Sequence, residues 1–338
     1  MFRENLSKII RRIDLNEAEM SEVISEIFSG SATDAQIGAV MAALATKGET
    51  FEELAGAAKA MRKKARRIQS VSSTVVDTAG TGGDGARTFN ISTTAAFVIA
   101  GCGVTVAKHG NRSISSKCGS ADLLEAFGLN LQMGPELVEE AVAEIGIGFL
   151  FAPLFHGAMR YAANARKELG LRTIFNMLGP LTNPAGANCQ LIGVYAPELT
   201  EMFAGALRLL GAKRAFVVHG HDGLDEISVC APTRISELKD EQIHTYDISP
   251  ENYFDHAAAP DELLGGNPGE NAEITRSILQ GQPGSKRNVV LINAAAALVA
   301  AGRAETLEAG IQLAEKSIDT GAAAEKLEAL IQFSRENG

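Results

Sequence analysis

The chain has 338 residues, of which 46% are hydrophobic and 21% are charged, and its formal net charge is -10. A chain of this length and ordinary composition can bury a large core, in two domains or in one large domain with an appendage. The acidic balance argues against general binding to nucleic acid or to an anionic membrane, because both partners need an electropositive face.

Neither a targeting segment nor a membrane span is predicted. The first residues, Met1 to Asn5, lack the apolar core of a signal peptide, and the sequence has no run of about 18 apolar residues. The four cysteines are widely separated and form no C-x-x-C pair, so neither a zinc site nor a disulfide framework is indicated. We therefore expect a soluble cytoplasmic protein with reduced thiols.

Residues 1 to about 68 have the pattern of helices only. Thr50 and Glu53 form a capping box before an apolar helical pattern over 51–65, and Gly30 and Gly48 stand where helix C-caps belong. No cluster of catalytic residue types occurs here, so packing is the plain interpretation. We expect a small helical domain whose exposed apolar face suits a dimer interface.

From Val75 onwards, short β-type runs alternate with helical patterns. The β-type runs cover 75–78, 104–107, 147–151, 190–195 and 215–218. The helical patterns lie near 92–101, 120–127, 135–145, 154–168 and 198–210, followed by alanine-rich helices at 289–301, 304–317 and 321–335. This alternation predicts an α/β fold, with a mostly parallel central sheet flanked by helices and with ligands at the carboxyl ends of the strands.

The first chemical motif is the glycine-rich stretch 77–94, which has the pattern of a strand, a loop and a helix start. Four glycines between Gly80 and Gly85 let the backbone turn tightly and approach an anion. Polar side chains accompany them up to the start of the helix, namely Asp84, Thr88, Asn90, Ser92, Thr93 and Thr94. We favour a phosphate site at the helix N-terminus over an ordinary turn.

The spacing of Gly80, Gly82 and Gly85 also matches the dinucleotide fingerprint G-x-G-x-x-G. That fingerprint needs a helix that begins almost at once and an acidic residue about 20 residues further on. Here residues 87–90 separate the last glycine from the helix, and the next strand ends in Lys108 instead of an acid. Binding of NAD is therefore disfavoured.

The second motif, residues 108–120, directly follows the second predicted strand. It holds two lysines, an arginine, four serines and two glycines, and so forms an electropositive loop lined by hydroxyl groups. Such a loop suits a diphosphate. Taken alone it has the composition of a solvated loop, but two such loops at successive strand ends favour a ligand site.

The third motif, residues 217–228, carries adjacent Asp225 and Glu226 at another strand end. Carboxylates are hard oxygen ligands, and magnesium typically uses one or two of them together with substrate phosphates. An exposed acidic turn is the plain alternative. His219 and His221 also suggest a transition-metal pair, which we disfavour because no third nitrogen or sulfur ligand is evident nearby.

The fourth motif is a helical pattern over 155–166, followed by the segment 172–184. A planar guanidinium in a cleft can bind a carboxylate through two hydrogen bonds, and Arg160, Arg166 and Arg172 are the candidates. The spacing does not choose among them. For each, a surface arginine is the plain alternative.

Together these motifs resemble the anthranilate phosphoribosyltransferase family. The resemblance rests on 80–84 with 90–93, on 108–113, on 172–184 and on the pair 225–226, and it covers nearly the whole chain. It implies a helical domain over 1–68 with a contribution from about 165–185, and an α/β domain over 74–338 that binds phosphoribosyl diphosphate. It also implies an active site in the cleft between them and a homodimer formed through the helical domains.

The resemblance further implies which residues form the site. Phosphoribosyl diphosphate would be bound by Gly80, Gly83, Asp84, Thr88, Asn90, Ile91, Ser92, Thr93, Lys108, Asn111, Arg112, Ser113, Ser115, Ser116 and Ser120, with the 108–116 loop closing over it. Anthranilate would contact Gly80, His109, Asn111, His156 and Arg166, and here the resemblance, not the spacing, selects Arg166. Magnesium, as two ions, would be bound by Ser92, Asp225 and Glu226.

The implied activity is transfer of the phosphoribosyl group to the amine of anthranilate, with release of diphosphate, in tryptophan biosynthesis. Departure of diphosphate gives the ribose oxocarbenium character, and magnesium and cationic side chains assist by neutralising the leaving group. The aromatic amine becomes strongly acidic once it bonds the ribose. Neither a covalent nucleophile nor a strong base is then required, and positioning carries much of the rate.

Three alternatives stay open at this point. A pyrimidine nucleoside phosphorylase-type enzyme would use the same cleft with phosphate and a nucleoside, although the 108–112 loop and Arg166 weigh against it. A dehydrogenase would bind NAD. A non-catalytic relative that binds nucleic acid would have lost the metal acids, whereas this chain keeps Asp225 and Glu226. An anthranilate synthase partner that supplies anthranilate also stays open.

Overall fold

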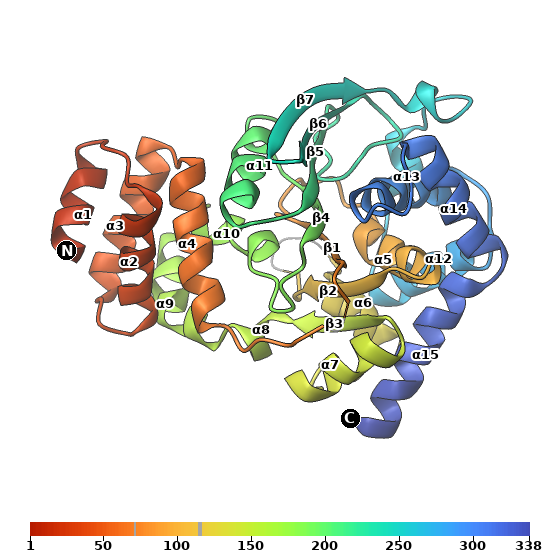
Figure 1. The fold of residues 1–338 in the computed structure, drawn as a ribbon, viewed down its shortest axis with the longest axis horizontal. Coiled ribbons are helices and arrows are strands. Elements are labelled where there is room, and N and C mark those ends of the chain that lie inside the picture. Colours follow the sequence, from red (N-terminus) through yellow and green to blue (C-terminus); the bar gives the residue numbers. More distant parts are fainter. Residues whose placement is uncertain (71, 114–116) are drawn as a thin grey trace.

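The computed structural model describes residues 1–70, 72–113 and 117–338, which form a helical region beside a larger α/β region (Figure 1). In the helical region, four helices follow one another in chain order: α1 (Phe2–Ile10), α2 (Glu17–Phe28), α3 (Asp34–Lys47) and α4 (Phe51–Lys64). Capping boxes begin α2, α3 and α4 at Asn16, Thr33 and Thr50. The capping box predicted at Thr50 is thereby confirmed.

A later segment of the chain returns to this helical region. The helices α9 (Arg160–Leu169) and α10 (Ile174–Met177) pack against α3, and α9 also packs against α2 (Figure 1). Asn164 of α9 donates a hydrogen bond to Asp34 of α3 at 2.7 Å, and the Arg62 guanidinium donates to the Leu181 carbonyl at 2.7 Å. One apolar core therefore holds side chains from α1–α4 and from residues far along the chain.

The α/β region is built on a seven-stranded sheet. Its strands are β1 (Val75–Gly80), β2 (Thr105–Gly110), β3 (Ile147–Phe151), β4 (Cys189–Gly193), β5 (Arg214–Gly220), β6 (Thr233–Lys239) and β7 (Gln242–Ile248). They lie in the order β3-β2-β1-β4-β5-β6-β7, and β1 to β5 are mutually parallel. The predicted mostly parallel sheet is thus confirmed. Strands β2 and β3 lie on one side of β1, and β4 to β7 lie on the other. The switch point of the sheet, where the strand order reverses, therefore lies between β1 and β4.

Further helices pack against this sheet or against one another, and they share its apolar core. They are α5 (Ile91–Gly101), α6 (Ser120–Ala126), α7 (Pro135–Glu144), α8 (Ala152–Phe155), α11 (Leu199–Leu209), α12 (Pro268–Leu279), α13 (Ser285–Ala300), α14 (Leu307–Asp319) and α15 (Ala322–Asn337). The nearly all-buried α13 packs between α5 and α14 (Figure 1). None of the helices in the described ranges is long and apolar enough to cross a membrane.

The strands β6 and β7 form an antiparallel hairpin that was not predicted. Its turn residues, Asp240 and Glu241, both have positive φ, at 50° and 62°, between the paired residues Lys239 and Gln242. A two-residue hairpin turn of this kind usually carries Asn-Gly or Asp-Gly, because most side chains disfavour positive φ. The sequence lacks that signal, so the hairpin was missed.

The helical pattern near 154–168 also differs from the structure, where it is not one continuous helix. Here α8 ends at Phe155, a 3-10 turn covers Gly157–Met159, and α9 begins at Arg160. The break falls at His156, whose φ of -113° and ψ of 51° are not helical. As a result, His156 contacts His109 of β2 while Arg166 stays on α9.

Candidate active site

The loop after β1 turns through three glycines. Gly82, Gly83 and Gly85 have φ of 65°, 80° and 73°, in the left-handed region that glycine adopts without steric cost. The Arg172 guanidinium stacks 4.4 Å from the ring centre of Tyr195 and donates a hydrogen bond to the Gly83 carbonyl. Of the three arginine candidates in the fourth motif, Arg172 is thus the one that contacts this loop.

The same loop is anchored at the switch point of the sheet. The Thr81 N–H donates to the Gly193 carbonyl at the end of β4, at 2.9 Å, and the Gly82 N–H donates to Asp225 Oδ2 at 2.8 Å. The loop ends at Asn90, the N-cap of α5. The N-terminus of α5 therefore opens beside the loop, with its partial positive charge directed there.

The remaining residues of the first motif lie along this path. Thr88 forms an isolated β-bridge with Leu264, and Asp84 Oδ1 accepts the Ala86 N–H at 3.3 Å. The first turn of α5 contains Ile91, Ser92 and Thr93, of which Ser92 contacts the acidic segment described next.

The acidic pair after β5 lies directly against the glycine-rich loop and α5. The Ser92 hydroxyl and backbone N–H both donate to Glu226 Oε1, the N–H at 3.2 Å. Asp225 lies so close to β1 that a Cβ added to Gly80 would stand 2.5 Å from its Oδ2. The structure thus brings together Gly80, Ser92, Asp225 and Glu226, which come from three separate segments of the sequence.

Burial sets the protonation of this pair. Burial raises the pKa of Glu226 to about 7, against which its hydrogen bond from Ser92 and the charge of Lys108 act. Burial also raises the pKa of Asp225 well above its usual value, and the neighbouring carboxylates of Asp84 and Glu226 add to the shift. A cation bound beside the two acids would favour their charged forms and so oppose these shifts.

Hard oxygen atoms are the donors that this cluster offers, and they fit magnesium. Within residues 1–70, 72–113 and 117–338, no group of three or more His, Cys, Asp and Glu side chains is placed to hold a metal ion. A magnesium ion here would therefore need further oxygen ligands, and substrate phosphates are the usual ones.

A buried polar network lies beneath the site, at the ends of β1 and β2. Asp77 accepts the His109 N–H at 3.1 Å and the Asn183 side-chain amide at 2.7 Å, and Lys108 Nζ donates to the Thr78 carbonyl at 2.5 Å. Burial raises the pKa of Asp77 and lowers that of Lys108, while each charge opposes the shift of the other. Sequence reasoning missed Asp77 and Asn183, although a carboxylate inside an apolar strand was a signal.

His109 and His156 lie in contact at the edge of this network. His109 Nδ1 is 3.1 Å from the Gly179 carbonyl, which can only accept, so the ring proton is on Nδ1. His156 Nε2 lies 3.2 Å from His109 Nε2 and must then be the donor. This leaves His156 Nδ1 as a buried acceptor without a partner among the described residues. Burial lowers the pKa of His109 to about 3 and that of His156 to about 4.

These depressed pKa values predict a loss of stability in acid. Below pH 6.5 the histidines of the unfolded chain bind protons, whereas the two buried histidines of the native state stay neutral. The free energy of unfolding therefore falls as the pH drops toward 4. At about pH 5 we expect His156 alone to account for about 2 kcal/mol. The variant His156→Gln should therefore lose about 2 kcal/mol less than wild type between about pH 7 and pH 5, measured by urea unfolding.

The matched control is His244→Gln on the edge strand β7, where the side chain is exposed. This variant should keep the wild-type dependence on pH. Equal acid sensitivity of wild type and His156→Gln would contradict the assignment of a buried neutral pair.

The second motif forms the loop between β2 and α6. The Arg112 guanidinium pairs with Asp122 at 2.9 Å and with Glu125 at 2.7 Å, and these acids raise its pKa. The Asn111 carbonyl accepts the Ser120 hydroxyl at 3.2 Å, and the Ser113 N–H donates to Asp122 at 3.1 Å. In this structure Arg112 thus faces α6, while the two further candidates of this motif, Ser115 and Ser116, lie outside the described residues.

The other arginine candidates stand on α9. Arg166 lies 5.8 Å from the ring centre of Phe175, and burial lowers its pKa. Arg160 is exposed and stacks on Tyr161 at 4.8 Å. The half-buried position of Arg166 distinguishes it from Arg160 as a candidate for a bound carboxylate.

The two histidines of the third motif diverge. His219 is buried, with Nδ1 2.7 Å from the Val194 carbonyl. His221 is exposed, with Nε2 3.7 Å from Asp247. Each therefore has its own neighbour, and the pair does not converge on one point.

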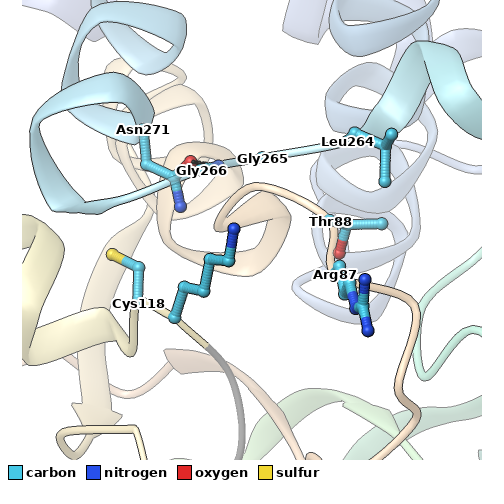
Figure 2. A pocket seen from close by; sticks show the side chains of 8 residues that line it. Arg87, Thr88, Cys118, Leu264, Gly265, Gly266 and Asn271 are labelled. Carbon is cyan, nitrogen blue, oxygen red and sulfur yellow. Dashed lines mark hydrogen bonds between the residues drawn. The ribbon is translucent and has the colours of Figure 1, made fainter.

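A pocket of about 180 Å³ opens next to the N-terminus of α5 (Figure 2). One side is formed by the first two motifs and the other by the segment that leads into α12; the lining residues are Arg87, Thr88, Lys117, Cys118, Leu264, Gly265, Gly266 and Asn271. Sequence reasoning missed the 264–271 side, because no helix was predicted over α12. The only signal was the pair Gly265-Gly266 before a capping sequence.

Comparison with known proteins matches the helical region and the α/β region to two domains of a glycosyl transferase family. The model of the helical bundle domain of a glycosyl transferase family matches residues 3–65, and the model of its a/b domain matches 72–324. Anthranilate phosphoribosyltransferases from Desulfosudis oleivorans and Syntrophobacter fumaroxidans are 70% and 69% identical, each over 100% of both chains.

Solved structures agree with these relatives. The anthranilate phosphoribosyltransferase from Thermus thermophilus has a TM-score of 0.93 at 42% identity, covering 98% of this chain and 99% of its own. The Saccharomyces cerevisiae enzyme in complex with PRPP and Mg has a TM-score of 0.90 at 28% identity, covering 99% and 98%. The chain therefore belongs to the anthranilate phosphoribosyltransferase family.

Proposed function

We propose that the chain transfers the phosphoribosyl group of phosphoribosyl diphosphate (PRPP) to the amine of anthranilate and releases diphosphate, a step of tryptophan biosynthesis. The observation that carries the proposal is the contact between Glu226 and Ser92 in the first turn of α5, beside the glycine-rich loop. That contact lies at the switch point of the sheet, where ligands of open α/β sheets bind. The relatives named above carry this activity in their names.

PRPP would lie over the glycine-rich loop and the N-terminus of α5. The unpaired N–H groups of a first helical turn, together with its partial positive charge, favour an anion. The diphosphate would contact the 80–93 stretch, while Lys108 and the rest of the 108–116 loop would contact it from the end of β2, as the resemblance to the family implies. Lys108 is already near, since its amine lies on the Thr78 carbonyl at the end of β1.

Ser92, Asp225 and Glu226 would hold magnesium, and we propose two ions. Bound magnesium supplies positive charge that stabilises the departing diphosphate. The chain itself holds Glu226 buried and Asp225 half-buried, and Ser92 orients Glu226 through two hydrogen bonds. The raised pKa of Glu226 supports the assignment, because it results chiefly from burial of the carboxylate, and a nearby cation would offset that cost.

Anthranilate would lie on the side of Arg166, whose guanidinium suits the carboxylate. Gly80, Asn111, His109 and His156 would line the same space. The two histidines are neutral, given pKa values of about 3 and about 4, and so would not compete with Arg166 for the carboxylate. Orientation of the amine toward the ribose would carry much of the rate.

The decisive measurement is the loss of anthranilate fluorescence when PRPP is added to the purified protein, with magnesium and with a chelator. A loss that depends on magnesium is the expected result. No loss by a folded protein would overturn the proposal. In that case, phosphate-dependent cleavage of a pyrimidine nucleoside would support the phosphorylase alternative, and binding to an oligonucleotide would support the nucleic-acid alternative.

The proposal also covers the domain boundaries, the oligomeric state, the location and a partner of the protein. We infer domain boundaries at 1–68, with 165–185, and at 74–338, supported by the core that α9 and α10 share with α1–α4. A homodimer through the helical domain is supported by exposed Ile10 and Ile13. A cytoplasmic location is part of the same proposal, and an anthranilate synthase partner would supply the second substrate.

A further inference from the structure

Asn271 is a buried polar residue of α12 that stands in the pocket wall opposite the glycine-rich loop, at 2% exposure. It lies between Gly266 and Cys118, with its side-chain nitrogen toward Cys118 (Figure 2). Neither the motifs of the sequence nor the proposed substrate contacts include it. A buried amide is expensive unless it is fully hydrogen-bonded, so its partners indicate what it does.

Asn271 is the middle link of a hydrogen-bond chain with one possible polarity. The Gly266 N–H donates to Asn271 Oδ1 at 2.7 Å, and the Asn271 amide donates to Asn90 Oδ1 at 2.9 Å. The Asn90 amide in turn donates to the Cys118 carbonyl at 3.1 Å. A backbone N–H can only donate and a carbonyl can only accept, so the two ends of the chain fix the orientation of both side-chain amides.

This orientation matters because of where Asn90 stands. It is the N-cap of α5, yet its side chain makes no capping hydrogen bond to that helix. One N–H of its amide is used by Cys118, and the other has no partner among residues 1–70, 72–113 and 117–338. Because Asn271 and the Cys118 thiol both donate to the oxygen, at 2.9 Å and 3.3 Å, Asn90 presents a donor, and not an acceptor, at the helix N-terminus. A donor is what a phosphate oxygen requires.

Backbone contacts near Asn271 hold its side chain within hydrogen-bonding distance of Asn90. The Phe89 N–H donates to the Leu263 carbonyl at 3.3 Å, and the Gly265 N–H donates to the Arg87 carbonyl at 3.0 Å. A Cβ on Gly265 would stand 2.6 Å from the Phe89 backbone and 2.7 Å from Asn271 Oδ1. The 263–265 segment is therefore pressed against 87–89, which fixes α12 relative to Asn90.

We propose that Asn271 is a positioning residue that orients the Asn90 amide so that Asn90 donates a hydrogen bond to PRPP. The inference rests on the proposed function and adds a residue that acts through Asn90. Thr275, one turn further along α12, is its structural counterpart. It is also buried, but its hydroxyl lies 3.0 Å from that of Thr94 within α5 and so contacts the helix instead of the loop.

The test compares Asn271→Asp with Asn271→Ala. Asp keeps the shape and accepts the Gly266 N–H, but it sets an oxygen against Asn90 Oδ1. This repulsion displaces the Asn90 amide from the position that its bond to the Cys118 carbonyl fixes, so its free N–H is no longer directed at the substrate. Ala removes the link without adding a repulsion, and Asn90 keeps its two hydrogen bonds with Cys118. We expect KM for PRPP to rise about tenfold to a hundredfold in the Asp variant and less than about tenfold in the Ala variant. KM for anthranilate should stay near the wild-type value.

A role in packing alone predicts the opposite order, because Ala leaves a cavity and Asp does not. Thr275→Val is the matched control: it should lower the melting temperature with no change in KM for PRPP. Because a new carboxylate could also repel the substrate through space, Asn271→Asp is repeated in an Asn90→Ala background. The increase in KM should largely vanish there, and its full persistence would overturn the proposal.

Binding of magnesium diphosphate, measured by titration calorimetry on the same variants, separates this inference from the proposed function. If wild type binds diphosphate but transfers no ribosyl group to anthranilate, the proposed function fails. The order of affinities, with Asp weaker than Ala and Ala weaker than wild type, would still support the role of Asn271. Equal affinities of the variants and wild type would refute that role whether or not the enzyme turns over.

Discussion

Turnover is expected to fall by about a thousandfold or more when Asp225→Asn and Glu226→Gln are combined, while the fold persists. The amides keep the shapes of the acids but lose the charge that would hold magnesium beside the departing diphosphate. Ser92 can still donate to the side-chain carbonyl oxygen that replaces Glu226 Oε1, so the first turn of α5 should stay in place. The measurement is the rate of anthranilate fluorescence loss at saturating PRPP and magnesium.

The same double variant should be more stable than wild type at about pH 8. The pKa of Glu226 is raised from 4.5 to about 7, so the native state favours the protonated acid, and wild type loses stability as the pH rises through that range. For Glu226 alone this amounts to about 3 kcal/mol, which the amide variant does not lose. Urea unfolding at about pH 5 and pH 8 measures the difference.

The adjacent pair Asp240 and Glu241, at the exposed turn of the β6–β7 hairpin, provides a matched control. Asp240→Asn with Glu241→Gln makes the same change in charge and should leave turnover unaltered. Near-normal turnover of the Asp225 and Glu226 variant would instead show that these acids do not hold the catalytic metal.

Gly193→Ala is expected to cost both activity and stability. Gly193 ends β4 and is paired with Gly80 of β1 and Val218 of β5, so its backbone is held on both sides. An added Cβ would overlap the carbonyl group of Asp225, and the Gly193 backbone cannot move away because the strands on both sides hold it. The segment that carries Asp225 must then move. We expect about 3 kcal/mol less stability and at least about a hundredfold lower turnover.

Gly38→Ala tests whether loss of any glycine has this effect. Gly38 lies within α3, where a Cβ would meet no atom within 4 Å, and alanine is the better helix former. Its turnover should match wild type and its melting temperature should not fall. A Gly193→Ala protein with wild-type turnover and melting temperature would refute the close approach of β4 to Asp225.

Much of the fold was predictable because its signals lie within short stretches of the sequence. The capping box at Thr50 and the alternation of apolar runs gave the helical region and the parallel strands. Placement of the 80–93 stretch near Asp225 and Glu226 was predictable as well, because the carboxyl ends of parallel strands meet at one edge of a sheet. The Ser92 contact with Glu226 agrees with that expectation.

What the sequence could not supply depends on partners far along the chain. The environment of Asp77 is set by Asn183, 106 positions away, and neither residue has a local signal for the other. The choice among Arg160, Arg166 and Arg172 depends on which aromatic ring each one packs against. Asn271 belongs to a helix that was not predicted, so its contact with Asn90 could not be predicted either.

The return of α9 and α10 to the first four helices has a consequence for the order of events during synthesis. The core of α1–α4 includes Ile174, Phe175, Met177 and Leu178, so its apolar surface stays partly exposed until these residues leave the ribosome. The strands β1, β2 and β3, with the helices between them, are made in the interval. The N-terminal helices therefore cannot finish as an independent folding unit, and the growing chain carries an open apolar face through much of its translation.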